Sequence, residues 1–255
     1  MLVPFNTLQG QPLDASNGTI GRVRDFYFSA DDWAIDYFLT DIGSWFSYYS
    51  VLLPAAVVQG YNRDEKTISV ELTTLQVQLS PTLESNKSAS KQNRMNGCDN
   101  VSLRPNVTEL LPLRGAINVA PAEKNTCDQP DGRHQHLYSS EELRRNYTLR
   151  VCDGELGFVE NFILQHDDEW QLRYLVIQIS WWPGKTVLLP REYIEDISVE
   201  RCEIVVSLPR LVVEQAPEYN SSITINGGYE QRLRDHYTRP LAGAPTCMTP
   251  LVNGR

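Results

Sequence analysis

Apolar and polar positions alternate in short runs along two separate stretches of the chain. In the first stretch, Gly21–Phe28 carries apolar Val23, Phe26 and Phe28 at roughly every second position. A period of two predicts a β-strand with one buried face. The polar segment Ser29–Asp32 predicts a turn, and the alternation resumes in Trp33–Leu39. We therefore expect these residues to form a β-hairpin.

The second stretch repeats this pattern, with strands predicted at Phe158–Leu164 and Trp170–Ile177 around the turn His166–Glu169. Shorter apolar runs predict further strands, the first of which ends at a proline. These runs are Val51–Pro54, Thr67–Leu72 and Glu203–Leu208.

Helical patterns are short. Thr74–Leu79 and Arg210–Glu214 each fit one helical turn before a proline, and Ser139–Glu142 is a capping box that opens a helix over Ser140–Arg145. Tyr229, Leu233 and Tyr237 are spaced four apart, which predicts an amphipathic helix over Gly228–Tyr237.

The two strand-rich stretches are copies of one another, related by a shift along the chain that carries Gly18 onto Gly154. About a third of the positions from Gly18 to Pro81 recur unchanged at this shift, once an insertion is allowed for in the turn that precedes Trp170. The matches include the Val51–Pro54 strand, which recurs as Val187–Pro190. This agreement indicates an internal duplication.

The duplication predicts an all-β chain made of two small six-stranded β-barrels in tandem, because closure removes the exposed edges of a sheet. We expect a first domain at 1–83, a second domain with a C-terminal helix at 139–237, and a tail at 238–255. Residues 84–138 are rich in Asn, Ser, Pro, Gly and Lys and predict a long, irregular and mobile linker, and we expect short helices after each barrel.

Charge narrows the choice of partner. The 255 residues carry a formal charge of −9, from 23 basic and 32 acidic side chains. Segments 8–81 and 147–217 carry −5 and −6. An acidic chain is unsuited to nucleic acid, which requires a cationic face, and to electrostatic binding of anionic lipid.

Membrane insertion is not expected either. The longest nearly apolar run, Val51–Val58, contains a proline and is too short to span a bilayer. Residues 1–17 lack a basic start followed by an apolar stretch, so no secretory signal is predicted. We expect a cytoplasmic protein.

The duplicated motifs resemble the PRC-barrel family, which includes the cytoplasmic barrel of the photosynthetic reaction-centre H subunit and a domain of a ribosome maturation factor. The resemblance rests on G-x-I-G-R-V-x-D-F-Y-F-x-x-D-D-W, D-x-G-x-W and V-L-L-P in the first copy. The second copy adds W-W-P-G-K-x-V-L-L-P, A-P-E-Y and G-Y-E-x-R-L-x-D-H-Y. The resemblance covers both duplicated stretches, which make up more than half of the chain.

This resemblance implies a non-enzymatic adaptor or assembly module that mediates protein–protein interaction, with no cofactor. The partner is an unidentified protein or another copy of the chain. Two alternatives stay open: an accessory protein of a membrane redox or photosynthetic complex, reached peripherally through a partner, and an ion- or small-molecule-binding stress protein. The first copy departs from the family at Ser47–Ser50, where the second has Pro183–Thr186 with its Lys185.

Candidate chemistry is sparse. Asp31-Asp32 and Asp167-Asp168-Glu169 could approach a cation, but acidic turns more often cap their own backbone. His134 and His136 lie near Cys127 in the predicted linker without a second ligand pair. No motif for nucleophilic catalysis accompanies the histidines. We expect no catalytic, cofactor or metal site.

The five cysteines are scattered and odd in number, which favours reduced cytosolic thiols, with a Cys152–Cys202 bridge as the alternative. The glycine pairs Gly18/Gly21 and Gly154/Gly157 open a strand. We expect the first of each pair to have positive φ and the second to allow close backbone approach.

Aromatic residues near the hairpin ends are the best interaction candidates. The duplicated tryptophans predict core packing, but Trp181 is additional and lies beside Trp182. Exposed aromatic patches mark protein contacts. The predicted interaction surface comprises Trp181, Trp182, Lys185, Phe46, Tyr48 and Tyr49.

Overall fold

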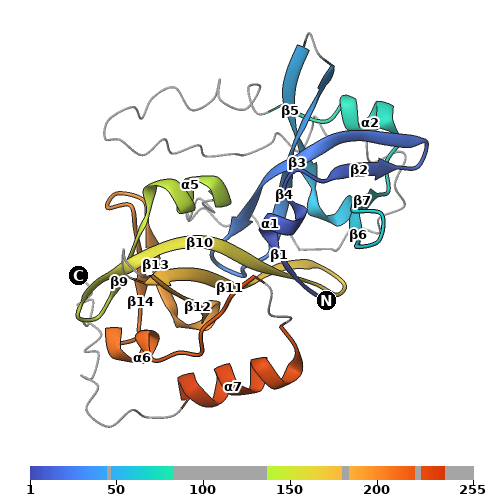
Figure 1. Cartoon of the computed structure of the whole chain (residues 1–255). Helices are drawn as coiled ribbons and strands as arrows, with labels where there is room; N and C mark the ends of the chain where they lie inside the picture. The colour runs from blue at the N-terminus through green and yellow to red at the C-terminus, as the bar shows by residue number, and fades with distance from the viewer. Residues whose placement is uncertain (45–46, 83–136, 180–183, 222–224, 239–255) are drawn as a thin grey trace, which may run out of the picture. The chain divides into compact units, whose positions relative to one another are not determined.

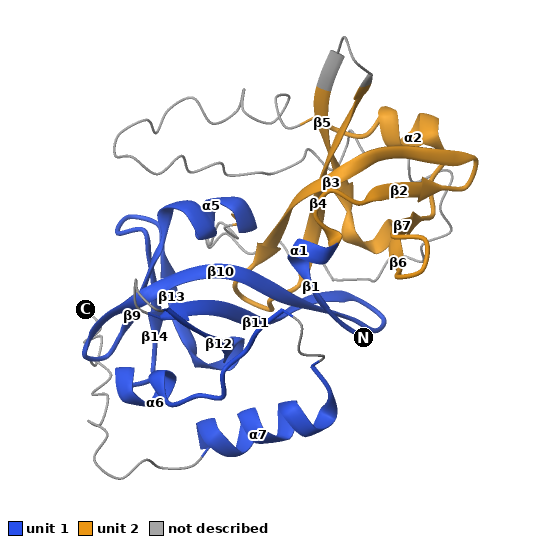
Figure 2. Cartoon of the chain, viewed as in Figure 1, with its two compact units in different colours: residues 1–7, 96–98, 140–255 blue, residues 8–95, 99–139 orange. Residues whose placement is uncertain are grey.

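The computed structural model describes residues 1–44, 47–82, 137–179, 184–221 and 225–238, without the side chains of Ser44, Ser47 and Tyr48. The chain is mostly β and divides into two compact units (Figure 2). Among the described residues, unit 1 comprises Met1–Thr7 and the chain from Ser140 onward, and unit 2 comprises Leu8–Ser139. The predicted linker, apart from its last two residues, and the tail lie outside the described residues.

Unit 2 contains one seven-stranded sheet, whose strands β2 to β7 are labelled in Figure 1. The strand order is β5-β4-β3-β2-β7-β6, and β8 pairs with β3. Its strands are β2 (Pro12–Ala15), β3 (Gly18–Ser29), β4 (Ile35–Ser44), β5 (Ser47–Pro54), β6 (Val58–Asn62), β7 (Thr67–Val70) and β8 (Leu137–Ser139). The predicted hairpin is β3–β4. Its second strand starts at Ile35 rather than Trp33, because Trp33 has a φ of 60° and lies in the turn.

Unit 1 contains a second seven-stranded sheet in the order β12-β11-β10-β9-β14-β13, with β1 paired to β10. Its strands are β1 (Leu2–Pro4), β9 (Thr148–Val151), β10 (Gly154–His166), β11 (Trp170–Ile179), β12 (Lys185–Pro190), β13 (Ile194–Ser198) and β14 (Glu203–Val206). The two sheets have the same strand order, and each contains one parallel pair, β2–β7 or β9–β14.

Short helices connect or follow the strands: α1 (Phe5–Leu8), η1 (Ala55–Val57), α2 (Thr74–Gln78), α5 (Ser140–Asn146), η3 (Arg191–Tyr193), α6 (Arg210–Glu214) and α7 (Gly227–Thr238). The four helices that the sequence predicted are α2, α5, α6 and α7. Thr73 begins α2 with a capping box, in which its side chain and that of Gln76 bond each other's backbone N–H.

Each sheet gains a seventh strand from outside its own copy of the duplicated pattern. The first strand of the chain, β1, pairs with β10 at Ile163–Gln165. The strand that precedes the second copy, β8, pairs with β3 at Tyr27–Ser29. The shift between the copies carries Tyr27–Ser29 onto Ile163–Gln165, so β1 and β8 occupy corresponding places in the two sheets. The compact units therefore differ from the predicted ranges 1–83 and 139–237 at these two strands.

A buried polar side chain holds each exchanged segment. Asp25 on β3 is 1% exposed, and its Oδ2 accepts a hydrogen bond from Ser139 Oγ at 2.5 Å while its Oδ1 accepts from Phe26 N–H at 2.8 Å. The corresponding residue on β10, Asn161, is also buried, and its Oδ1 accepts from Asn6 N–H at 3.2 Å. Burying these groups is tolerable because both find partners.

The glycine prediction is confirmed by backbone geometry. Gly18 and Gly154 have φ values of 142° and 133°, as expected for the first member of each pair. A Cβ on Gly157 would overlap the Gln178 carbonyl oxygen, and one on Gly21 would lie 2.8 Å from that of Asp41. The second glycine in each pair therefore allows adjacent strands to approach closely.

The Asp25 contact yields a stability prediction. Replacing Asp25 with Ala removes the acceptor for two buried donors, which should cost about 2–3 kcal/mol locally. Amide hydrogen exchange in Leu137–Ser139 and in β3 should then accelerate by about 30- to 150-fold. Asp25→Asn is the matched control and should exchange more slowly than Asp25→Ala, because it keeps an acceptor oxygen. Equal exchange in all three proteins would contradict this role of Asp25.

Candidate functional site

The predicted interaction surface is described only in part. Tyr49 lies on β5 opposite Ile42 and is 37% exposed, as an interaction role requires. Tyr48 lies opposite Gly43, but its side chain is not described. Trp181, Trp182 and Phe46 lie outside the described residues. The interaction role of this surface stays a prediction.

Lys185, the remaining member of the predicted surface, begins β12. Its Nζ donates hydrogen bonds to the carbonyl oxygens of Glu214 at 2.8 Å and Ala216 at 2.6 Å. Both acceptors lie at the end of α6 or just after it, so the ammonium ties that end to the sheet. Lys185 corresponds to Tyr49 at the shift between the copies, and these two members of the predicted surface therefore have different surroundings.

The acidic turns bond their own chain. Asp32 Oδ1 accepts from Ala34 N–H at 3.1 Å, which is the turn-capping role expected for such residues. Asp167 Oδ1 lies 2.8 Å from the Met1 amino group, and its Oδ2 accepts from the Gln165 amide at 2.5 Å. These contacts lower the pKa of Asp167, with the hydrogen bond from the amino group as the largest cause. Within the described ranges, no three His, Cys, Asp or Glu side chains gather as metal ligands.

Cys152 and Cys202 are disulfide-bonded, so the expectation of reduced thiols is wrong for these two. They are not bridged to each other. The register sets Glu203 opposite Thr148, so Cys202 flanks the start of β9, whereas Cys152 follows its end and donates its N–H to Leu208. At about 3.3 Å per residue, this separation exceeds the roughly 7 Å that a disulfide spans between Cα atoms. The other cysteines, Cys98, Cys127 and Cys247, lie outside the described residues.

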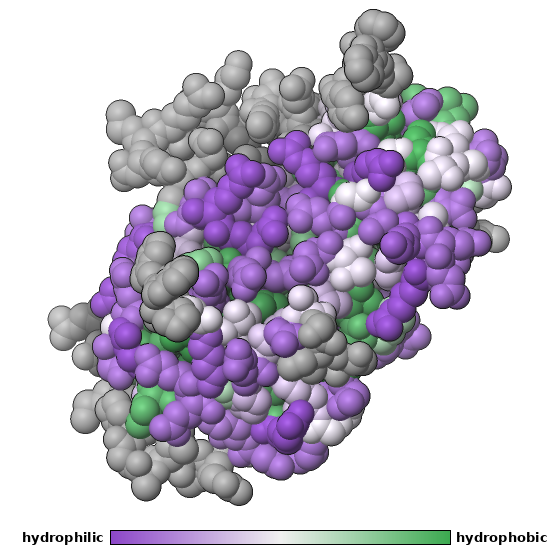
Figure 3. Space-filling model, in the orientation of Figure 1, coloured by the Kyte–Doolittle hydropathy of each residue, from purple (hydrophilic) through white to green (hydrophobic). Residues whose placement is uncertain are grey.

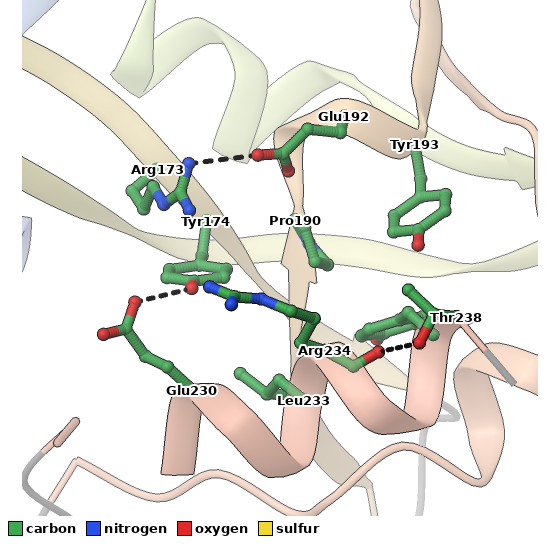
Figure 4. A pocket seen from close by; sticks show the side chains of 10 residues that line it. Arg173, Tyr174, Pro190, Glu192, Tyr193, Glu230, Leu233, Arg234 and Thr238 are labelled. Carbon is green, nitrogen blue, oxygen red and sulfur yellow. Dashed lines mark hydrogen bonds and ion pairs between the residues drawn. The ribbon is translucent and has the colours of Figure 1, made fainter. Parts of the chain in front are cut away.

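A small cavity in unit 1 is formed where α7 packs against β11, β12 and η3 (Figure 4). It has a volume of about 130 Å³ and is lined by tyrosines from three elements: Tyr174, Tyr193 and Tyr237. The Tyr193 and Tyr237 rings lie 5.3 Å apart. A cavity of this size holds a few water molecules or one small group.

Polar contacts around this cavity attach α7 to the sheet. Tyr174 donates its hydroxyl to Glu230 at 2.8 Å, and Tyr237 donates to the Leu188 carbonyl at 2.8 Å. Next to them, Arg173 pairs with Glu192 at 3.0 Å. These groups satisfy one another, which suits helix docking better than catalysis. The buried stripe Tyr229, Leu233 and Tyr237 is the one that the sequence predicted for this helix.

Burial raises the pKa values of these tyrosines. The pKa of Tyr174 is raised to about 12, first by desolvation and then by its hydrogen bond to Glu230. Desolvation is also the main cause that raises the pKa of Tyr229 to about 12. The pKa of Tyr237 is raised further by the same cause.

Two grooves and a set of exposed leucines were not predicted from the sequence. The grooves lie beside Gly21 and Gly157, and the leucines are Leu75, Leu79 and Leu211 on or just after α2 and α6. Each groove brings together side chains from distant segments, and an isolated leucine in a short helix gives no sequence signal of exposure.

No family model and no curated protein matches this chain. None of the helices in the described part of the chain combines the length and the apolar character needed to cross a membrane.

Alkaline pH should release α7. Tyr174 and Tyr229 have pKa values of about 12, above the ordinary 10.0, so their neutral forms stabilise the docked helix fully below pH 10. That stabilisation should be lost as pH rises from 10 through 12. Ultraviolet titration of tyrosinate should show a late group of tyrosines that ionises as α7 becomes exposed to hydrogen exchange.

Tyr174→Phe provides the matched variant. It removes the hydrogen bond to Glu230 and should weaken helix docking at neutral pH by about 1 kcal/mol. Ionisation of all 12 tyrosines together near pH 10, with α7 unaffected, would contradict this assignment.

Proposed function

We propose that this chain is a non-enzymatic adaptor made of two PRC-barrel-like units, whose function is to bind a protein partner. The observation that carries the proposal is the placement of its exposed apolar side chains. Among the described residues, the large hydrophobic side chains that are exposed are Met1, Tyr49, Leu75, Leu79 and Leu211. Three of these five are leucines that lie on, or directly after, the short helices α2 and α6. These helices follow strands β7 and β14.

Leu75 and Leu79 form an apolar surface on α2 and at its end. They are 61% and 72% exposed, and their spacing of four places them on one face. The helix carries no charged residue in its first or last turn. In Figure 3, hydrophobic side chains gather over α2, at the upper right, on a face that is otherwise mostly hydrophilic. An apolar surface without charges suits a protein contact, because desolvating it costs little.

The corresponding helix of unit 1 retains part of this surface. Leu211, on α6, is the counterpart of Leu75 in the second copy and is 38% exposed. The buried neighbours are also paired, since Val77 on α2 and Val213 on α6 both have 0% exposure. Packing requires the valines, but it does not require the exposed leucines, so a contact outside the unit explains why they occur at matching positions.

The order of strands supports the PRC-barrel part of the proposal. Two sheets with the same order are expected of tandem copies of one domain. The motif that begins at Gly18 lies on β3 and its copy on β10, and V-L-L-P lies on β5 and β12. The free side of β5 is bonded by Thr82 and Pro81, and that of β12 by Glu218 and Tyr219. Covered edges are expected of barrels. Barrel closure belongs to the proposal.

The expected cytoplasmic location is a separate part of the proposal. Cys152 and Cys202 are disulfide-bonded, and a reducing cytoplasm normally keeps thiols free. The adaptor function does not depend on the compartment.

The test is affinity capture from extracts of the source cells, followed by reconstitution with the purified captured protein. Leu75→Gln/Leu79→Gln should reduce binding at least about tenfold, because burying two leucines contributes several kcal/mol. The melting temperature should change little, since both side chains are exposed.

Gln78→Ser is the matched control, because Gln78 is exposed on the same helix. It should bind as the unaltered chain does. Equal capture by the leucine variant and the unaltered chain would contradict the proposal, as would a leucine variant that unfolds.

A further inference from the structure

Two grooves occupy corresponding places in the two units. In unit 1, a groove of about 540 Å³ lies between the end of α5 and the first half of β10. In unit 2, a groove of about 500 Å³ lies between the chain after α1 and the first half of β3. The shift between the copies carries lining residues of one groove onto those of the other: Gly10 onto Asn146, Pro12 onto Thr148, Ile20 onto Leu156 and Gly21 onto Gly157. Both volumes fall in the range of specific ligand sites.

The groove of unit 1 has a cationic rim. Arg144, Arg145 and Arg210 line it together with two carboxylates, Glu155 and Glu214, which leaves a net charge of +1. The segment 147–217, which contains most of unit 1, carries −6. The groove is therefore a local cationic site on an acidic unit.

These arginines keep donors that their present contacts do not use. The Arg144 Nε is buried without a hydrogen-bond partner in the described part of the chain. Arg145 is 73% exposed and pairs through Nη2 with Glu141 at 2.8 Å. The Arg210 guanidinium donates a hydrogen bond to the Glu155 carbonyl oxygen, and its Nη1 lies 3.9 Å from Glu214 Oε1. A guanidinium has five N–H donors in a planar fork that matches a carboxylate.

The groove of unit 2 reaches the same charge with different residues. Arg22 and Arg24 line it with one carboxylate, Asp41, for a net charge of +1. Arg22 Nη1 donates a hydrogen bond to the Gly10 carbonyl oxygen at 2.8 Å. Arg24 Nη1 lies 3.8 Å from Asp41 Oδ1. The shift carries these arginines onto Phe158 and Glu160, so simple copying does not explain the shared charge.

The wall of the unit 1 groove is apolar. Tyr147, Leu156 and Ile179 line it and are 3%, 5% and 4% exposed. A ligand that complements this groove places anionic groups at the rim and an apolar group against the small apolar surface between them. The acidity of both units disfavours a nucleic acid, whose phosphates would meet repulsion beyond the groove.

We propose that each groove binds an acidic peptide segment of a protein partner, with its carboxylates on the rim arginines and an apolar side chain against the wall. The inference rests on the proposed protein-binding function and specifies the chemistry of the partner. It is independent of the leucines on α2 and α6, so the two surfaces can fail separately.

The test is calorimetric titration of the full chain with the peptide DELFED, with the neutral peptide NQLFQN for comparison. The unaltered chain should bind two DELFED peptides, and NQLFQN should bind at least about tenfold more weakly. Arg144→Gln/Arg145→Gln and Arg22→Gln/Arg24→Gln should each leave one site, and the quadruple variant none. Affinity should fall as salt rises.

Arg150→Gln/Arg201→Gln is the matched control, because it removes two arginines of unit 1 that do not line the groove. It should keep both sites. Circular dichroism melts identify any variant that unfolds, and Arg144→Lys/Arg145→Lys, which keeps the charge, should then retain binding.

Equal binding of both peptides, no binding, or full stoichiometry in the quadruple variant would overturn the proposal. Self-association that the quadruple variant abolishes would instead assign the grooves to a second copy of the chain and also overturn it.

Discussion

The exchange of β1 and β8 is the constraint on which the two sheets depend. Each sheet is completed by a strand that lies next to the other copy of the pattern in the sequence. Asp25 and Asn161 hold the exchanged segments through buried hydrogen bonds, whose loss would leave polar groups unpaired in the interior. A unit cut from the chain at the boundary of the duplicated pattern would lack its seventh strand, so the two units depend on one chain.

This constraint also shapes the surface. The outer sides of β5 and β12 are bonded within the units by the segments that follow β7 and β14, and the exchanged strands bond β3 and β10. The proposed contacts with a partner are apolar at the exposed leucines of α2 and α6 and charged at the grooves beside Gly21 and Gly157. Cys152 and Cys202 are disulfide-bonded, which bears on the cellular compartment of the chain and not on how it binds a partner.

The sequence predicted the elements that have their own periodicity. The long hairpins β3–β4 and β10–β11 and the helix α7 were predicted because alternation, or apolar spacing by four, extends over enough positions to be recognised. Strands β1 and β8 were missed because so short a strand carries no period, and their exchange depends on pairing between segments far apart in the sequence. Tyr49 is exposed, and its role in an interaction surface stays a prediction. The leucines were missed because residue type does not separate an exposed leucine from a buried one. The grooves were missed because Arg145 and Arg210 line one groove only in the folded unit.

The central claim is that this chain binds a protein through side chains of α2 and α6. Hydrogen exchange of the full chain, measured with and without the purified captured protein, tests it most directly. The account predicts slower exchange in Thr73–Ser80 and Pro209–Ala216 on binding, with β6, β7, β13 and β14 unchanged. Protection confined to α7, or no change in either helical segment despite saturated binding, would contradict it.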